Sequence, residues 1–321
     1  MRGFLFKRIL QLIPTLLIVA AIVFLITRIL PGNPAAVMLG PQASAQDIAE
    51  FSEKLGLNDP LYQQFFEYVI RLITLDFGNS LSYNQPVVNL ILERFPNTII
   101  LAISAILIAV TIGVPAGIIA ARNQNNIIDY SVTTLSLIGV SMPIFWLGIM
   151  LVLYFSVNLG WLPATGMGSL EEGFGDFLSH LVLPSLALAT IPTAQFSRVI
   201  RSSMLETISQ DYIKTARSKG LKESIVIYKH AFKNALTPLL TVMGLQFSML
   251  LGGAVLTETI FSWPGMGLLI IDAIEKRDFV VVQSTVIFIA FIYVVINLIV
   301  DVLYKVVNPK VNLGSDGGGE N

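Results

Sequence analysis

Cysteine and histidine, which commonly carry catalysis or bind metals, are scarce in this sequence of 321 residues. It has no cysteine, which excludes thiolate metal sites, disulfides and cysteine nucleophiles. Its two histidines, His180 and His230, lie far apart in sequence, so neither has a histidine neighbour for a metal centre. No segment matches the G-x-x-x-x-G-K-[ST] loop that holds the phosphates of ATP. We therefore predict no catalytic residue, no metal site and no cofactor bound by this chain.

The sequence has one long, strongly basic segment, from Arg198 to Pro238. This segment holds eight lysines and arginines against three acidic residues, and it lies between two charge-free runs. Apolar residues recur at helical spacing before and after Gly220, which can supply the left-handed residue that ends a helix. The pattern predicts a short hairpin of two helices. Its basic residues are Arg198, Arg201, Lys214, Arg217, Lys219, Lys222, Lys229 and Lys233.

Two roles fit a basic hairpin beside a membrane. Juxtamembrane lysines and arginines commonly lie on acidic lipid headgroups, and charge by itself does not separate this role from protein docking. Thr215, Ala216 and Gly220 favour docking, because small residues leave one side of the helix nearly bare for another protein. A helix that only contacts headgroups is expected to carry Leu or Phe there. We therefore interpret the hairpin as a surface where a partner outside the membrane binds.

The elements that hold this hairpin are membrane helices. The chain is 54% apolar and 13% charged, whereas soluble domains are about 25% charged. Charge-free runs that reach the roughly 20 residues of a spanning helix recur along it. The run from Tyr130 to Leu170 provides only one span, because its second half is a loop that contains Asn158, Gly160, Pro163, Thr165, Gly166 and Gly168. We predict six spans, at residues 9–30, 98–121, 131–157, 181–199, 236–257 and 280–304.

Within these spans, glycine and proline predict local features. Pro143, Pro184 and Pro192 should kink or break their helices. Gly113 and Gly117 have the GxxxG spacing that is typical of closely packed membrane helices.

The polar, acidic stretch at residues 31–97 predicts short helices outside the membrane. Ser44 and Asp47 form a capping box at the start of one helix, and Gly56 is placed to end it. Asp59 and Pro60 form the N-cap and first turn of the next helix. Neither helix is apolar enough to span a membrane. We expect a small extracytoplasmic helical cap.

The distribution of lysine and arginine predicts the orientation. With the N-terminus inside, the inner side holds 14 of these residues and the outer side holds 6. The positive-inside rule therefore places both termini and the hairpin in the cytoplasm. We expect the glycine-rich residues 314–321 to be disordered. The inner segments are residues 1–8, 122–130, 200–235 and 305–321, and the outer segments are residues 31–97, 158–180 and 258–279.

Several segments together carry a family resemblance. The stretches DYIKTARSKGL and HAFKNALTPLL, at residues 211–221 and 230–240, resemble the cytoplasmic coupling-helix motif of ABC importer permeases. The family is that of dipeptide, oligopeptide and nickel permeases, and the chain is similar to its B-type subunit. Further stretches in family order include RFPNTIILAISA, SMPIFWLGIML and ETIFSWPGMG, so the resemblance covers nearly the whole chain. Two departures from the generic importer motif are Lys214-Thr215 in place of Glu-Ala and a proline displaced to Pro238.

The resemblance implies an all-α integral membrane protein of the bacterial cytoplasmic membrane. It has six transmembrane helices, an extracytoplasmic helical cap after helix 1, a coupling-helix hairpin between helices 4 and 5, and a permease domain over residues 98–304. The implied partners are a second permease subunit, two cytoplasmic ATPases that carry ATP and Mg²⁺, an extracytoplasmic substrate-binding protein and membrane lipid, without nucleic acid. The implied ATPase-coupling residues are Tyr212, Lys214, Thr215, Ala216, Arg217, Lys219, Gly220 and Leu221.

Polar residues within or next to the spans are candidates for the translocation path or outer gate. They are Ser141, Gln195, Gln246, Glu258 and Asn297. The alternative is hydrogen bonding between helices, worth about 0.6 kcal/mol on average in one measured membrane protein, and for any single residue we favour it.

Three further functions compete with peptide import. The same machinery could import nickel or a metal chelate. A stand-alone ion-coupled carrier is a different class, and the lack of Asp, Glu, Lys, Arg or His in the span cores argues against proton coupling. The third alternative is an intramembrane enzyme, but the sequence shows no nucleophile–base pair and no cluster of metal ligands that would support it.

Overall fold

The computed structural model describes residues 2–29, 34–40, 42–54, 56–80, 82–169 and 171–307. These residues are mostly helical and divide into two compact units. The first unit comprises Met1–Asn97 and Gly265–Val294, and the second comprises Thr98–Pro264 and Val295–Asn321. The disorder predicted for residues 314–321 falls outside the described residues.

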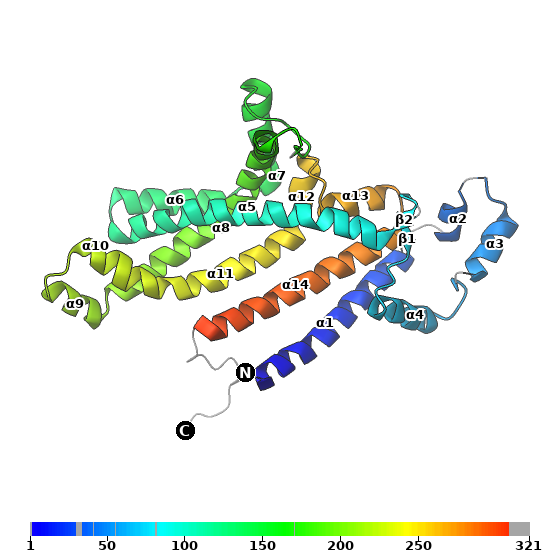
Figure 1. Ribbon diagram of the computed structural model, residues 1–321, viewed down its shortest axis with the longest axis horizontal. Helices are drawn as coiled ribbons and strands as arrows, with labels where there is room; N and C mark the ends of the chain where they lie inside the picture. Colours follow the sequence, from blue (N-terminus) through cyan, green and yellow to red (C-terminus); the bar gives the residue numbers. More distant parts are fainter. Residues whose placement is uncertain are drawn as a thin grey trace. The chain divides into compact units, whose positions relative to one another are not determined.

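The first unit contains two long helices that lie side by side, with short elements near one of their ends (Figure 1). Ala20 and Val23 of the N-terminal helix share a buried cluster with Ile287 of the C-terminal helix. A two-stranded antiparallel ladder, which the sequence did not predict, pairs Asn79 with Pro86. The elements are α1 (Arg2–Ile29), α2 (Pro34–Leu39), α3 (Ala45–Lys54), α4 (Leu61–Ile73), β1 (Asn79–Ser80), β2 (Gln85–Pro86), α13 (Met266–Glu275), and the parts of α5 (Val87–Arg122) and α14 (Phe279–Val307) that belong to this unit.

Helix α3 begins and ends where the sequence predicts. The Asp47 backbone N–H donates to Ser44 Oγ at 3.2 Å, and the Ser44 N–H donates to Asp47 Oδ2 at 3.1 Å, so the capping box is confirmed. Gly56 has a φ of +63°, which confirms it as the left-handed residue after α3. The start of α4 differs from the prediction. Pro60 is its N-cap and has extended backbone angles, and no side chain caps the helix, so Asp59 is not the N-cap.

A buried carboxylate fastens the β1–β2 hairpin to the start of α14. The Ser80 hydroxyl donates to Asp278 Oδ2 at 2.7 Å, and the Ser82 backbone N–H donates to the same oxygen at 3.0 Å. Beside it lies an apolar core contributed by α5, α13 and α14, which comprises Val87, Leu90, Ile91, Met266, Leu269, Ala273 and Val281. These contacts order the residues that the sequence assigned to an outer cap and an outer loop.

In the second unit, α8 is the central helix, and α6, α7 and α11 pack against it (Figure 1). Its elements are the remainder of α5 and α14, α6 (Ile127–Ser141), α7 (Ile144–Leu151), the π-helix η1 (Val152–Asn158), α8 (Phe174–Ile208), α9 (Asp211–Ser218), α10 (Glu223–Ile225), the π-helix η2 (Val226–Ala231), α11 (Phe232–Gly253) and α12 (Val255–Ile260).

Five described helices are long and apolar enough to cross a membrane, or six if α6 and the α7–η1 helix together form one span. The angle of the bend between α6 and the α7–η1 helix is 100°. Pro143 causes the break, because it lacks a backbone N–H, and Met142 before it is extended with a ψ of 125°. The predicted break at Pro143 is thus confirmed. At Pro184 and Pro192, by contrast, α8 continues without a break.

Most of the long helices extend beyond the predicted span borders, and at the hairpin this changes its two arms. The span predicted at 181–199 lies within α8, which continues to Ile208, because neither glycine nor proline lies between Ser197 and Ile208. The first arm of the predicted hairpin is therefore not one helix: it comprises the end of α8, a break at Ser209 and Gln210, and α9. On the return side, α10, η2 and α11 follow one another without a gap, so the second arm is continuous with the next long helix.

Candidate functional site

The candidate site is the basic hairpin at one end of α8 and α11 (Figure 1). We call residues 211–223 the hairpin tip; it comprises α9 and the turn to Glu223. We call the contacts that α8 makes with α5 and α6 around Ser197–Arg201 the hairpin root. The tip carries the predicted coupling residues, and the root connects the tip to the long helices.

A glycine turn closes the hairpin tip. Gly220 has a φ of +75°, its N–H donates to the Arg217 carbonyl at 2.9 Å, and the Leu221 N–H donates to the Ala216 carbonyl at 3.4 Å. This pair of hydrogen bonds is the Schellman motif, which satisfies the last carbonyls of a helix. A Cβ at position 220 would meet no heavy atom within 4 Å. The predicted helix stop is confirmed, and open space surrounds it.

An ion pair bridges the same turn. Arg217 Nη2 and Nε donate to the two oxygens of Glu223 at 2.7 and 3.1 Å, and the two side chains are 40% and 47% exposed. The hydrogen bond to Glu223 holds the pKa of Arg217 above its usual value. Lys214 Nζ lies 2.9 Å from Asp211 Oδ1 within α9. The tip is therefore held by local contacts that leave its outer surface in solvent.

The predicted coupling residues do not all lie on that outer surface. Ile213 and Ala216 form the inner face of α9, and Val226 and Ile227 of η2 are buried in the return arm that α9 packs on. The expectation that Ala216 belongs to a bare outer side is therefore wrong, because helical spacing places it beside Ile213. The other predicted coupling residues are exposed: Tyr212, Lys214, Thr215, Arg217, Lys219, Gly220 and Leu221.

The hairpin root contains a second arginine–carboxylate pair. Arg201 Nε and Nη2 of α8 donate to the two oxygens of Asp129 in α6 at 2.5 and 2.7 Å. The Asp129 side chain is 1% exposed and also accepts the Asn125 N–H at 3.0 Å. Sequence reasoning missed this pair, because the partners are 72 residues apart. The pair joins the start of α6 to α8 ten residues before α9 begins.

Glycines of α5 complete the root. A Cβ at Gly113 would lie 2.5 Å from the Thr193 carbonyl oxygen, and one at Gly117 would lie 2.5 Å from that of Ser197. The α5 backbone thus lies so close to α8 that a side chain of any size at Gly113 or Gly117 would overlap the α8 backbone. The close packing predicted from the GxxxG spacing is confirmed.

The predicted pathway residues differ in burial and in their partners. Ser141 is exposed in an open groove at the α6–α7 break, while Gln195 of α8 and Gln246 of α11 are half-buried. The Ser248 hydroxyl lies 3.5 Å from Asn297 Oδ1, a contact between α11 and α14 of the kind that the alternative reading expects. Glu258 is fully buried, and Thr98 Oγ1 donates to its Oε1 at 2.7 Å. Its carboxylate therefore fastens α12 to α5 and faces no open path here.

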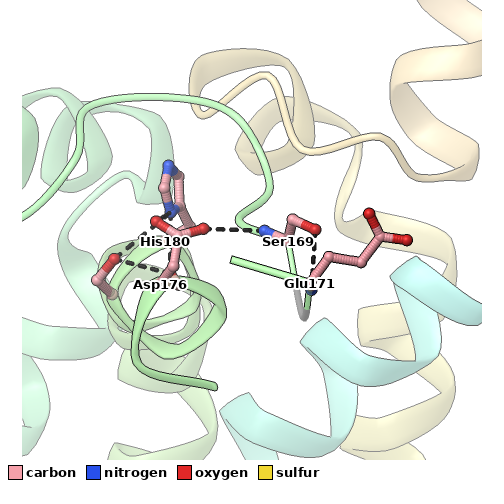
Figure 2. Close-up of polar contacts among 5 residues, drawn as sticks. Ser169, Glu171, Asp176 and His180 are labelled. Carbon is pink, nitrogen blue, oxygen red and sulfur yellow. Dashed lines mark hydrogen bonds and ion pairs between the residues drawn. The ribbon is translucent and has the colours of Figure 1, made fainter. Parts of the chain in front are cut away.

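The loop before α8 folds back onto the first turns of that helix (Figure 2). Asp176 Oδ2 accepts the Ser169 backbone N–H at 2.9 Å, and His180 Nδ1 lies 3.0 Å from the Asp176 carbonyl oxygen. The Ser169 hydroxyl in turn accepts the Glu171 N–H at 3.1 Å. Among the described residues, no group of three or more His, Cys, Asp or Glu side chains could hold a metal ion. The absence of a metal site stays a prediction.

Comparisons with known proteins identify the family. Residues 113–313 match the family described as "Binding-protein-dependent transport system inner membrane component". Residues 1–102 match the family described as "Binding-prot-dependent transport system membrane comp, N-term". This chain belongs to the binding-protein-dependent transport system inner membrane component family. The family resemblance read from the sequence is confirmed.

Curated relatives of this inner membrane component match it over 97% of its length and 99% of theirs. The chain is 46% identical to the dipeptide transport system permease protein DppB of Alkalihalophilus pseudofirmus. It is 44% identical to the di/tripeptide transport system permease protein DppB of Pseudomonas aeruginosa. It is 43% identical to the glutathione transport system permease protein GsiC of Escherichia coli. These relatives are transport subunits.

Solved structures show the fold of this family member. It is similar to the MetNI methionine ABC transporter in an inward facing conformation, with a TM-score of 0.56 and 17% identity, covering 68% of this chain and 96% of that one. It is also similar to an amino acid ABC transporter, with a TM-score of 0.52 and 17% identity, covering 70% and 95%. The chain is therefore a multi-pass membrane protein with an ABC permease fold.

Proposed function

We propose that this chain is a permease subunit of an ATP-driven importer of dipeptides and oligopeptides. The observation that carries the proposal is the 43–46% identity to permeases named for dipeptide, di/tripeptide and glutathione transport, over 97% of this chain. Glutathione is itself a tripeptide, so the three named substrates share one chemical class. Identity over the full length includes the long helices as well as the hairpin.

In this proposal the hairpin tip docks on a cytoplasmic ATPase. The tip is basic and exposed, and local bonds hold its shape without help from a partner. A second permease completes the path, two ATPases bind ATP with Mg²⁺, and an extracytoplasmic binding protein delivers the peptide. The root supports transmission of the ATPase motion, because α5, α6 and α8 are joined there by backbone contact and by a buried ion pair.

Uptake into vesicles tests the substrate. Proteoliposomes hold this chain with its second permease and both ATPases, with ATP and Mg²⁺ on the ATPase side and binding protein and labelled substrate on the other. We expect ATP-dependent uptake of labelled dipeptide and tripeptide and no uptake of Ni²⁺. Uptake of Ni²⁺ without peptide uptake would assign the complex to metal import. Ion-gradient-driven transport by this chain alone would make it a secondary carrier.

Copurification with the ATPases tests the docking surface. We expect Gly220→Asp to insert and fold but to lose the ATPases, because an added charged side chain blocks close approach at the turn. Gly160→Asp is a matched control: Gly160 has a φ of +62°, and a Cβ there also meets nothing within 4 Å. The two substitutions thus add the same charge at glycines with similar positive φ angles. Gly160, however, lies in the loop predicted on the opposite side of the membrane from the tip. Equal ATPase recovery with both variants would refute docking at the tip.

A further inference from the structure

Helix α4 of the first unit has two apolar sides, of which only one is covered by protein. On the covered side, the Phe65 ring lies 5.5 Å from that of Phe24 in α1, edge to face, and the Tyr68 ring lies 5.9 Å from Phe24. Leu72 packs against the cluster that contains Ala20 of α1. Phe65 and Tyr68 of α4 thus contact α1 near its C-terminal end, and Leu72 packs on the cluster that α1 shares with α14 (Figure 1).

The second apolar side of α4 is exposed. Tyr62, Phe66, Ile70 and Ile73 recur at the spacing of one helix face, and they are 64%, 64%, 58% and 76% exposed. The third side of the helix is polar and carries Gln63, Glu67 and Arg71. A helix with one side on protein, one apolar side and one polar side fits the boundary between a membrane and water.

The contacts with α1 fix the depth of this exposed side. The apolar length of α1 that can cross a membrane runs from Leu10 to Thr27. Ala20 lies seven residues and Phe24 three residues before Thr27, or about 10 and 5 Å at the helix rise of 1.5 Å per residue. Interfacial helices bury their apolar face by about 5–10 Å. The exposed residues of α4 therefore lie at the depth where acyl chains begin.

The neighbouring surface of α1 indicates what covers α4. Ile22 and Leu25 of α1 are exposed at about the same depth and Ile18 about one turn deeper, and in a spanning helix such residues contact lipid. Tyr62, at the start of the exposed stripe, is of a type enriched at membrane interfaces. We propose that Tyr62, Phe66, Ile70 and Ile73 insert into the lipid leaflet at the Thr27 end of α1, with Glu67 and Arg71 facing water. Helix α4 is then a membrane-surface anchor of the predicted cap.

Spin labels test this inference on the assembled complex. The chain has no cysteine, so each single-cysteine variant of it carries one label, and the partner subunits are used in cysteine-free form. Phe66→Cys and Ile70→Cys each place a nitroxide on the exposed apolar side, and Glu67→Cys is the control on the polar side of the same helix. In lipid nanodiscs, collision with oxygen reports lipid, and collision with nickel ethylenediaminediacetate reports water. We expect the oxygen-to-nickel ratio at positions 66 and 70 to be several-fold higher than at position 67.

Two results would overturn the anchor. If positions 66 and 70 collide with nickel as readily as position 67, the stripe lies in water. If both reagents are excluded there, protein covers the stripe, and the second permease becomes the partner to test. Ile73→Cys repeats the measurement should Phe66→Cys fail to assemble. Quenching of a fluorophore at position 70, but not 67, by lipids spin-labelled in the upper acyl chain gives an independent reading.

Discussion

The root and the tip of the hairpin share two features, which are buried at the root and exposed at the tip. Each contains a glycine and an arginine that donates two hydrogen bonds to one carboxylate. At the root, a Cβ on Gly117 would overlap the α8 backbone, and Asp129 is buried. At the tip, a Cβ on Gly220 would meet nothing, and Glu223 is about half exposed.

The difference separates two tasks that one hairpin performs in the proposed importer. The root joins residues far apart in sequence, since Asp129 and Arg201 are 72 positions apart, so it makes α6 and α8 move together. The ion pair at the tip joins residues six positions apart, and the tip leaves its outer surface in solvent. Substitutions at the root should change stability, and substitutions at the tip should mainly change partner binding.

Gly117→Leu tests the root most severely. Its Cβ would lie 2.5 Å from the Ser197 carbonyl oxygen and 2.8 Å from Ile200 Cβ, and neither α-helical backbone can give way locally. We expect a loss of about 3 kcal/mol or more, at or beyond the upper end of typical overpacking costs. The measurement is the thermal unfolding midpoint of the detergent-solubilised chain. Gly175→Leu is the control, because a Cβ there meets nothing within 4 Å. Native-like unfolding of Gly117→Leu would show that the root is not closely packed in solution.

Asp129→Asn breaks the buried pair while keeping the shape of the side chain. Removing one partner of a buried pair costs about 3–5 kcal/mol, and we expect about 2–3 kcal/mol here, because the Arg201 side chain is 30% exposed and keeps some water. In the reconstituted importer, peptide uptake per ATP hydrolysed should also fall, because α6 and α8 are no longer joined. An unchanged unfolding midpoint and unchanged uptake per ATP would remove the root from the mechanism.

The sequence predicts the glycines of this comparison better than its ion pairs. Gly220 acts through backbone geometry within a few residues, and its position after a helical pattern is a sufficient signal. Gly113 and Gly117 act through close approach to α8, and their GxxxG spacing predicts that approach although it does not name the partner helix. The Asp129–Arg201 pair depends on how α6 packs on α8. The only signal in the sequence is that Asp129 is the one acidic residue in the short polar segment 122–130. The buried position of Ala216 was missed for the same reason: η2 determines which side of α9 is covered.

The helix ends show a similar limit. Pro143 predicted the α6–α7 break, but the bend of 100° depends on the packing of α7 against α8 and α12. Span borders drawn from charge-free runs placed the end of the fourth span at residue 199. Charged residues do not end a helix, and α8 continues to Ile208.

Gly220→Ala should have a moderate effect confined to the tip. An L-residue in the left-handed region costs roughly 1 kcal/mol more than glycine, and the surrounding space is open. Hydrogen exchange should therefore show the α9 amides about 5-fold less protected, with α8 unchanged. Lys219→Ala is the control, because Lys219 has a φ of −79°. A fall in global stability would mean that the tip supports the fold as the root does.

Glu223→Gln should have the smallest effect, although it is the same chemical change as Asp129→Asn. The pair with Arg217 is exposed, so water and salt screen it, and such pairs contribute about 0–1 kcal/mol. The change in α9 exchange should shrink further in 1 M salt, where the screening length is about 3 Å. The unfolding midpoint should stay at the native value, while that of Asp129→Asn falls. Equal destabilisation by the two substitutions would mean that burial does not distinguish root from tip, and the division of tasks between them would fail.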